Sequence, residues 1–439
     1  MSMIVWLARI LLMGYAVVLP IRGTAALQAT LLLTAFTALL WERRRELAAA
    51  WIEARWLLGP LLMFSFWVFA VCGFWPDLPS YSWADPSQRP QQPWFSLNLW
   101  RRDIAQPMLA LLCGYWAFRD AVSRHWLFTV QIILLAVLLA FAVNQFYIGE
   151  EIIRGPRLPD TNYWVKGTLF VRGLSRDNIF FSYVLLLLTP AVFWMVVQQI
   201  FLHTQNDSLK NPVNSVNPVK ESDLPRPLLV KEGRIFKTGS KIGWQGWFYL
   251  AALGVLFYLI FLNKSRGTWM ALYIELILIS AWMGRRVLIF FILGTTLMGV
   301  TAYKARPHWF QREYDANSTS RVEIYKKIPL LLLKRPFTGV GFGKDTVVKN
   351  YWHMIYQHAH NTFINMVLGV GFPGLALWLC ALAVYGRRFW RARMQGWSVR
   401  IGLALLVGFC VRNFVDDIWL SSNAELFWFL IGVLMPTKP

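Results

Sequence analysis

Hydrophobic residues in this chain come in long, nearly uninterrupted runs rather than in short amphipathic periods. Runs of about twenty apolar residues are typical of helices that cross a bilayer. We count about twelve such runs, at residues 3–21, 24–41, 57–75, 104–118, 126–148, 179–202, 245–263, 268–284, 287–303, 362–385, 400–416 and 424–436. The pattern therefore predicts an all-α membrane protein, a polytopic bundle of about 12 transmembrane helices.

Polar stretches divide the predicted bundle into three parts. Residues 1–303 hold spans 1–9 and include 203–243, whose Asn-Pro repeats predict a flexible low-complexity loop on the cytoplasmic side. Residues 304–361 form a basic polar stretch, which we expect to be a periplasmic loop domain between spans 9 and 10 that carries part of the active site. Residues 362–439 hold spans 10–12.

The positions of Arg and Lys in the short connections predict the orientation. Four Arg-rich connections fall on one side of a twelve-span arrangement, at 41–55, 119–124, 284–286 and 386–400. Basic residues in short loops mark the cytoplasmic side, so we place this side and both termini in the cytoplasm. The opposite side is the outer face.

The positive charge of the chain indicates what the outer face binds. The chain has a formal net charge of +21, and its longer outer loops are basic as well. Contact with anionic lipid headgroups would explain this charge, and so would an anionic lipid-linked substrate. Nucleic acid is excluded as a partner, because the charges are scattered through membrane-facing loops. The four cysteines lie within predicted spans and suggest neither a disulfide nor a thiolate metal site.

The strongest candidate for chemistry is His358-Ala359-His360-Asn361, placed where the basic stretch meets the tenth span. Histidine is the side chain best suited to move protons near neutral pH. Its position predicts a reaction site at a membrane surface.

Basic residues at three other places share this outer face. Arg172 and Arg176 precede the sixth span, and Arg266, beside Lys264, lies in a very short turn between the seventh and eighth spans. Arg321 lies in the large loop before the histidines. A guanidinium donates paired hydrogen bonds to phosphate at any relevant pH, so several converging arginines would bind a diphosphate. Alternatively, each Arg reaches separately to lipid headgroups.

Two carboxylates, Asp416 and Asp417, lie at the outer end of the eleventh span. They could orient a catalytic imidazole or accept hydrogen bonds from Arg412, or they could be an interfacial pair at a helix end. The outer loops contain no Asp-x-Asp, and the sequence has no His/Cys/Glu cluster at metal-ligand spacing, so we expect chemistry without a metal or cofactor. The glycines from Gly339 to Gly343 lack the spacing of a Walker loop and predict a turn that folds the outer loop back.

Several of these motifs, taken in their order along the chain, resemble those of a known family. They are Ser265-Arg266-Gly267, Arg321 with Tyr325, Gly339 to Gly343, and His358-Ala359-His360-Asn361 followed by Gly371-Phe372-Pro373-Gly374. In this order and on this common face, the chain resembles the O-antigen ligase and O-antigen polymerase superfamily of bacterial inner-membrane proteins. The resemblance covers the C-terminal half well and the N-terminal half only by span count and by the arginines before the sixth span.

The resemblance implies a multi-pass GT-C type glycosyltransferase of the bacterial inner membrane with a periplasmic active site. Such a ligase transfers a polysaccharide from undecaprenyl diphosphate to a hydroxyl of the lipid A core. The family histidine matches His360, with His358 as a second member of the site, and the family arginines match Arg266 and Arg321. A late acidic residue of the family falls at Asp416 or Asp417; we take Asp417. The chain departs from the family pattern at Gly369 and around Arg172.

The residue types fit that chemistry. His360 would take the proton of the sugar hydroxyl as it attacks the anomeric carbon, and the arginines would stabilise the leaving diphosphate, so one direct displacement would invert the configuration. The acceptor separates a ligase, which we favour, from an O-antigen polymerase and from a protein O-oligosaccharyltransferase. A transporter of lipid-linked sugars is the alternative from another class, and it would need the arginines but no histidine base.

Overall fold

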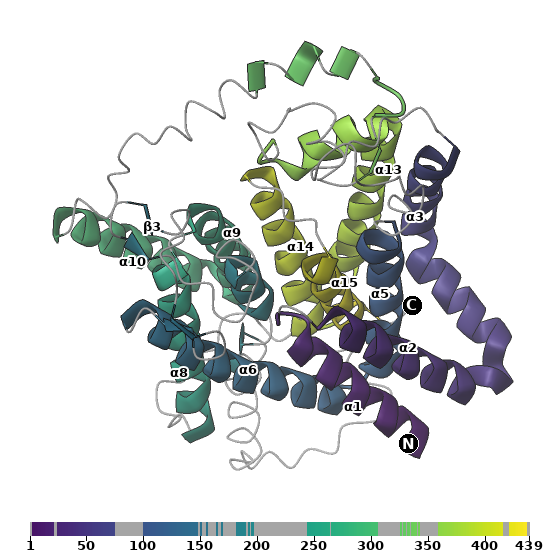
Figure 1. The fold of residues 1–439 in the computed structure, drawn as a ribbon. Helices are drawn as coiled ribbons and strands as arrows, with labels where there is room; N and C mark the ends of the chain where they lie inside the picture. Colours follow the sequence, from purple (N-terminus) through teal and green to yellow (C-terminus); the bar gives the residue numbers. More distant parts are fainter. Residues whose placement is uncertain are drawn as a thin grey trace, which may run out of the picture.

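Helices dominate the structure, a computed structural model of the chain. The residues described are 2–21, 24–74, 100–147, 150–151, 155–156, 164–165, 168–169, 181–189, 192–193, 195–196, 244–263, 265–305, 325–326, 328–330, 332–333, 335–339, 341–342, 359–415 and 421–436. The helices labelled in Figure 1, with two short turns, are α1 (Met3–Val18), α2 (Ala25–Glu42), η1 (Arg43–Glu46), α3 (Leu47–Phe74), η2 (Arg101–Ala105), α5 (Gln106–Ala117), α6 (Ala121–Tyr147), α8 (Trp244–Asn263), α9 (Arg266–Met283), α10 (Arg285–Ala305), α13 (Thr362–Arg391), α14 (Trp397–Val415) and α15 (Ser421–Leu434).

These helices coincide with the apolar runs of the sequence. Each run outside 179–202 contains one helix, and within 179–202 residues 181–189 are helical. The bounds differ from expectation by a few residues, except that α3 begins ten residues early, at Leu47. The polar residues between α2 and α3 form η1 (Arg43–Glu46), so a short 3₁₀ helix joins the two helices rather than a loop.

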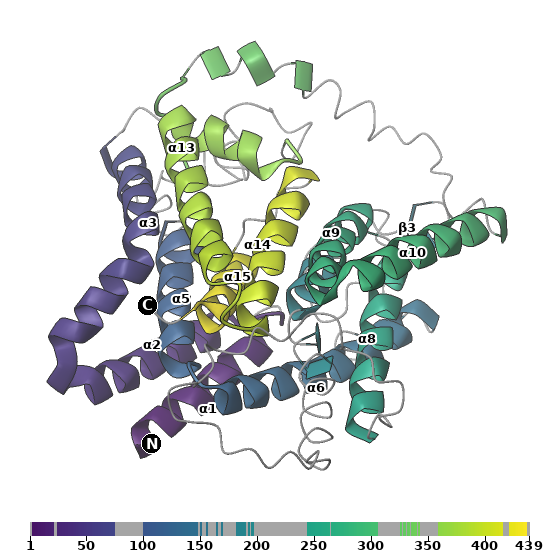
Figure 2. The same cartoon turned by 180° about the vertical axis from the view of Figure 1, so that it is seen from behind.

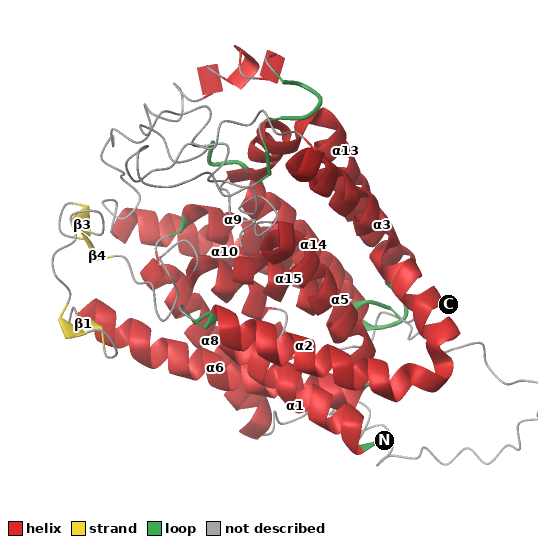
Figure 3. Ribbon diagram, turned by 45° about the vertical axis from the view of Figure 1, so that its right-hand side comes forward, coloured by secondary structure: helices red, strands yellow, loops and turns green. Residues whose placement is uncertain are grey.

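Four stretches of helix in the described residues are long and apolar enough to cross a membrane, at Ala25–Val71, Ala121–Val143, Thr362–Arg391 and Trp397–Val415. Shorter apolar helices accompany them. The expected fold class, an all-α membrane protein, is confirmed at this level. The structure adds two antiparallel pairs of two-residue strands that the sequence did not predict, β1 (Glu150–Glu151) with β2 (Gly155–Pro156) and β3 (Trp164–Val165) with β4 (Thr168–Leu169) (Figure 3).

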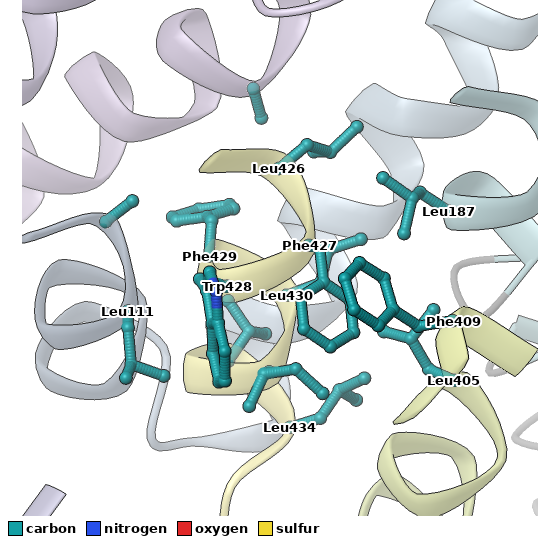
Figure 4. Close-up of a cluster of buried hydrophobic side chains, with 14 of the residues drawn as sticks. Leu111, Leu187, Leu405, Phe409, Leu426, Phe427, Trp428, Phe429, Leu430 and Leu434 are labelled. Carbon is teal, nitrogen blue, oxygen red and sulfur yellow. The ribbon is translucent and has the colours of Figure 1, made fainter. Parts of the chain in front are cut away.

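The core of the bundle forms around α15, which packs between α5 and α14 (Figure 4). Two glycines let α5 and α15 approach closely. A Cβ on Gly432 would lie 2.1 Å from the carbonyl oxygen of Leu111, and one on Gly114 would lie 2.5 Å from that of Phe429. Small residues at helix contacts are typical of membrane bundles, because close backbone packing replaces the hydrophobic effect as the source of association.

The four Arg-rich connections meet at one end of the bundle. Arg119 pairs with Glu53 across two of them. Arg388 donates from Nη2 to the carbonyl oxygen of Trp56 at 2.7 Å, and Arg400 donates from Nη1 to that of Trp282 at 3.4 Å. We call this the Arg-rich end. The opposite end, where α9 and α13 begin and α14 finishes, is called the site end.

Helix α13 is broken in its first half. Gly371 has φ 73° and ψ 176°, and Pro373 follows. The carbonyl oxygens freed by the break accept hydrogen bonds from elsewhere: Gly369 O from the N–H of Gly341 at 2.8 Å, and Val370 O from the indole of Trp67 at 2.8 Å. The glycine turn expected in the outer loop therefore packs against α13 at this break.

Candidate active site

His360 lies in a tight turn that leads into α13. It is the one non-glycine residue with a positive φ, 51°, among the residues that the structure describes. The turn is fixed on both sides. Ala359 donates its N–H to Oδ1 of Asn365 at 3.2 Å, and Asn361 caps α13 by accepting from the N–H of Ile364 at 3.0 Å. A left-handed conformation at a non-glycine residue is uncommon and is found where surrounding contacts enforce it, often at functional sites.

The capping residue also connects α13 to the last turn of α14. Nδ2 of Asn361 donates to the carbonyl oxygen of Phe414 at 2.9 Å. Carbonyl groups at a helix C-terminus have no partner within the helix, so this bond satisfies one of them. The start of α13 is therefore attached to the end of α14 one residue after His360.

Arg266 is the first residue of α9 and is exposed. The next residue, Gly267, packs against α14 so closely that a Cβ there would lie 2.7 Å from Cγ2 of Val415 and 3.0 Å from Nη1 of Arg412. Only glycine allows this approach without a shift of the neighbouring side chains. The glycine thus brings Arg266 to the same end of α14 as His360.

Arg412 is buried at the contact between these helices. Its Nε donates to Oγ1 of Thr268 at 3.1 Å, and its Nη2 donates to the hydroxyls of Ser182 at 3.4 Å and Ser265 at 3.5 Å. The sequence suggested Arg412 only as a partner for Asp416 and Asp417. The structure places it against the start of α9, while Asp416 and Asp417 lie outside the described residues.

Asn413, the next residue, binds different neighbours. Oδ1 of Asn413 accepts from the hydroxyl of Thr362 at 2.7 Å, and its Nδ2 donates to the hydroxyl of Tyr183 at 3.0 Å. Sequence reasoning missed Asn413. The signal available was an Arg-Asn pair inside a run that is otherwise apolar, since polar residues within spans are costly and are retained for a reason.

A pocket of about 340 Å³ opens where these elements meet. It is lined by Tyr325, Asn361, Ile364, Phe414 and Val415. Asn361 follows His360 in the chain, and Val415 contacts the position of Gly267, which follows Arg266. The pocket therefore adjoins both elements that carry the described candidates.

The other candidates from the sequence lie outside the described residues. These are His358, Asp416, Asp417, Lys264, Arg321, Arg172 and Arg176. The structure does bring together the helix ends next to several of them: residues 181–189, the start of α9, the start of α13 and the end of α14. Figures 1 and 2 both show α14 between α9 and α13.

Comparison with known proteins bears on the same region. Residues 251–379 match the family described as O-Antigen ligase. Three curated relatives are described as putative polysaccharide ligases: one of Rickettsia felis, 26% identical over 167 residues, one of Rickettsia conorii, 22% identical over 166 residues, and one of Rickettsia typhi, 24% identical over 167 residues. Each match covers 34% of this chain and 40% of the relative.

The family match spans α9 and the first part of α13, so it includes Arg266 and His360. The resemblance expected from the motifs is confirmed. Arg412 and Asn413 lie beyond residue 379, outside the matched segment.

Proposed function

We propose that this chain is a member of the O-antigen ligase superfamily and is itself an O-antigen ligase. It transfers a polysaccharide from undecaprenyl diphosphate to a hydroxyl of the lipid A core oligosaccharide, without a metal and with inversion, in lipopolysaccharide biosynthesis. The observation that carries the proposal is the family match over residues 251–379, which contain an exposed Arg266 and a conformationally fixed His360. The start of α9 and the start of α13 contact the same end of α14.

The proposed topology has about twelve spans in the bacterial inner membrane. The Arg-rich end faces the cytoplasm, because basic residues in short connections favour that side. The site end then faces the periplasm, where lipid-linked polysaccharide and lipid A core would meet. The three-part division at 1–303, 304–361 and 362–439 belongs to this proposal, with 304–361 as the periplasmic loop domain.

In the proposed reaction, neutral His360 takes the proton of the acceptor hydroxyl as the oxygen attacks the anomeric carbon. The bond from that carbon to the diphosphate oxygen breaks in the same step, and the diphosphate leaves with the electron pair. A positioned general base contributes about 10²- to 10⁴-fold. His358 and Asp417 are proposed to assist and orient the imidazole.

Arginine side chains stabilise the charge that develops on the leaving diphosphate. Arg266 is the member of this group that the structure describes, and it is exposed. Arg321, Arg172, Arg176 and Lys264 are proposed to complete the diphosphate site. The net charge of +21 fits an anionic donor and a phosphorylated lipid acceptor.

Deletion of the gene in its native host tests the function. Lipopolysaccharide is separated on a gel, and polymer attached to undecaprenyl diphosphate is detected by blotting. If the protein is a ligase, the deletion strain should contain bare core together with accumulated lipid-linked polymer. Core capped by one repeat would identify a polymerase, and an unchanged profile would direct attention to a protein acceptor or to transport.

A further inference from the structure

We propose that Arg412 and Asn413 are positioning residues that fix the start of α9, with Arg266, relative to the start of α13, with His360. We call these two residues the α14 clamp. The inference rests on the proposed function, because it assigns the clamp the task of aligning the diphosphate site with the base. The evidence comes from three features of the described residues.

The first feature is the direction of the two side chains. Successive residues of an α-helix point about 100° apart, so neighbours can reach different helices. Arg412 reaches the hydroxyls of Ser265 and Thr268, which lie on either side of Arg266 in the chain. Asn413 reaches the hydroxyl of Thr362, two residues after His360.

The second feature is a shared support on the helical segment 181–189. Arg412 donates to Ser182, and Asn413 donates to Tyr183. One pair of consecutive residues on α14 thus binds a consecutive pair on this segment. Rotation or sliding of α14 would therefore disturb the bonds of Arg412 to α9 and the bond of Asn413 to α13 at the same time.

The third feature is burial. Both clamp residues, together with Ser182, Tyr183, Thr268 and Thr362, are almost entirely buried. Water cannot easily replace a lost partner in such a place, so each hydrogen bond constrains the geometry more strongly than it would at a surface. An arrangement misplaced by about 1 Å can lower an enzymatic rate about 100-fold.

Loss of the Arg412 bond to α9 and loss of the Asn413 bond to α13 should have different effects on the kinetics. Thr268→Val keeps the shape of the side chain and removes the hydroxyl that accepts from Arg412. It should raise the KM for the lipid-linked donor about tenfold and leave kcat near the wild-type value, since Arg266 acts in diphosphate binding. Thr362→Val removes the hydroxyl that donates to Asn413. It should lower kcat about 10- to 100-fold with the donor KM unchanged, since His360 acts on the acceptor.

The experiment uses the full chain in lipid nanodiscs, with kcat and donor KM measured for each variant. Thr268→Ser and Thr362→Ser keep the hydroxyls and should restore each parameter. Thr189→Val is the matched control, because Thr189 is equally buried and, among the residues that the structure describes, bonds only the Leu185 carbonyl of its own helix at 3.2 Å. If both Val variants lower kcat and raise KM together, or if the Ser variants fail to restore them, the clamp is disproved.

Binding of undecaprenyl diphosphate alone separates the clamp from the proposed function. A wild-type protein that binds this lipid but transfers nothing to lipid A core contradicts the ligase assignment. The clamp is then still tested, because Thr268→Val should weaken lipid binding about tenfold and Thr362→Val should not. A wild-type protein that binds no undecaprenyl diphosphate overturns both proposals.

Discussion

At the scale of single residues, the sequence pointed to the proposed reactive groups and not to the contacts of the residues around them. Arg266 and His360 were predicted from residue type, position and resemblance. The observed contacts of Arg412 and Asn413 were not predicted. Thr268, which accepts from Arg412, is more than 140 residues away in the chain, and Thr362, which donates to Asn413, is more than 50 residues away. Contacts of that kind depend on which helices become neighbours, and hydrophobic patterning contains no such information.

Glu275 is a second buried group that apolar patterning could not explain. It lies in α9 against Gly408 of α14, and a Cβ on Gly408 would lie 2.1 Å from Oε1 and 2.5 Å from Cγ of Glu275. Gly408→Ala should therefore lower stability by about 1–3 kcal/mol through overpacking. The double variant Glu275→Ala, Gly408→Ala should recover most of the loss. Thermal unfolding in detergent measures both, and an unchanged melting temperature for Gly408→Ala would contradict the contact.

Asp120, in the connection before α6, gives a pH-dependent prediction. Partial burial raises the pKa of its carboxyl, but hydrogen bonds from Ser123 and the charge of Arg9 outweigh burial and lower that pKa below its usual value. A lowered folded-state pKa stabilises the protein above the unfolded pKa of about 3.9, and this contribution disappears as pH falls through the folded pKa.

Asp120→Asn keeps an acceptor for the Ser123 N–H and removes the charge pair. Because the Asp120 side chain is 48% exposed, the loss at pH 7 should be at most about 1 kcal/mol. Unfolding measured between pH 7 and pH 3 should show wild type and variant converging at the acid end. A constant difference across this range would show that the charge contributes nothing.

At the scale of elements, apolar run length predicted the helices, and it failed where backbone geometry departs from a straight helix. The Gly371-Phe372-Pro373-Gly374 sequence was noted only as a family feature, whereas the structure breaks α13 there. The break follows from long-range contacts with the segment containing Pro336 and Gly341. The two-residue strands are likewise too short to leave a periodic pattern.

Gly371→Ala tests the break in α13. The backbone angles at Gly371 fall in a region that only glycine adopts readily, and a Cβ would lie 2.1 Å from the carbonyl oxygen of Phe337. The substitution should cost about 1–3 kcal/mol or more in thermal unfolding. Gly254→Ala in α8 is the control, because a Cβ there meets no atom of the described part of the chain within 4 Å. This substitution should be neutral or slightly stabilising. Equal effects of the two substitutions would contradict the account of the break.

At the scale of the whole molecule, we propose different roles for the two opposite ends of the bundle. The grouping of the four Arg-rich connections on one side was predicted by counting spans, and the structure links them through Glu53, Trp56 and Trp282. At the site end, helix ends from distant parts of the chain lie together. Counting spans in the sequence could predict only that these helix ends share one side of the membrane. Their convergence on the last turn of α14 is the structural basis for the proposed ligase.

The most direct test of that account compares His360→Asn with Arg266→Gln in purified protein. Asn tolerates the left-handed backbone of His360, so the fold should persist while the base is lost. We predict that His360→Asn binds undecaprenyl diphosphate as wild type does and transfers polysaccharide to lipid A core about 10²- to 10⁴-fold more slowly. Arg266→Gln should instead lose donor affinity. Transfer by His360→Asn at the wild-type rate would contradict the assignment of His360 as the base.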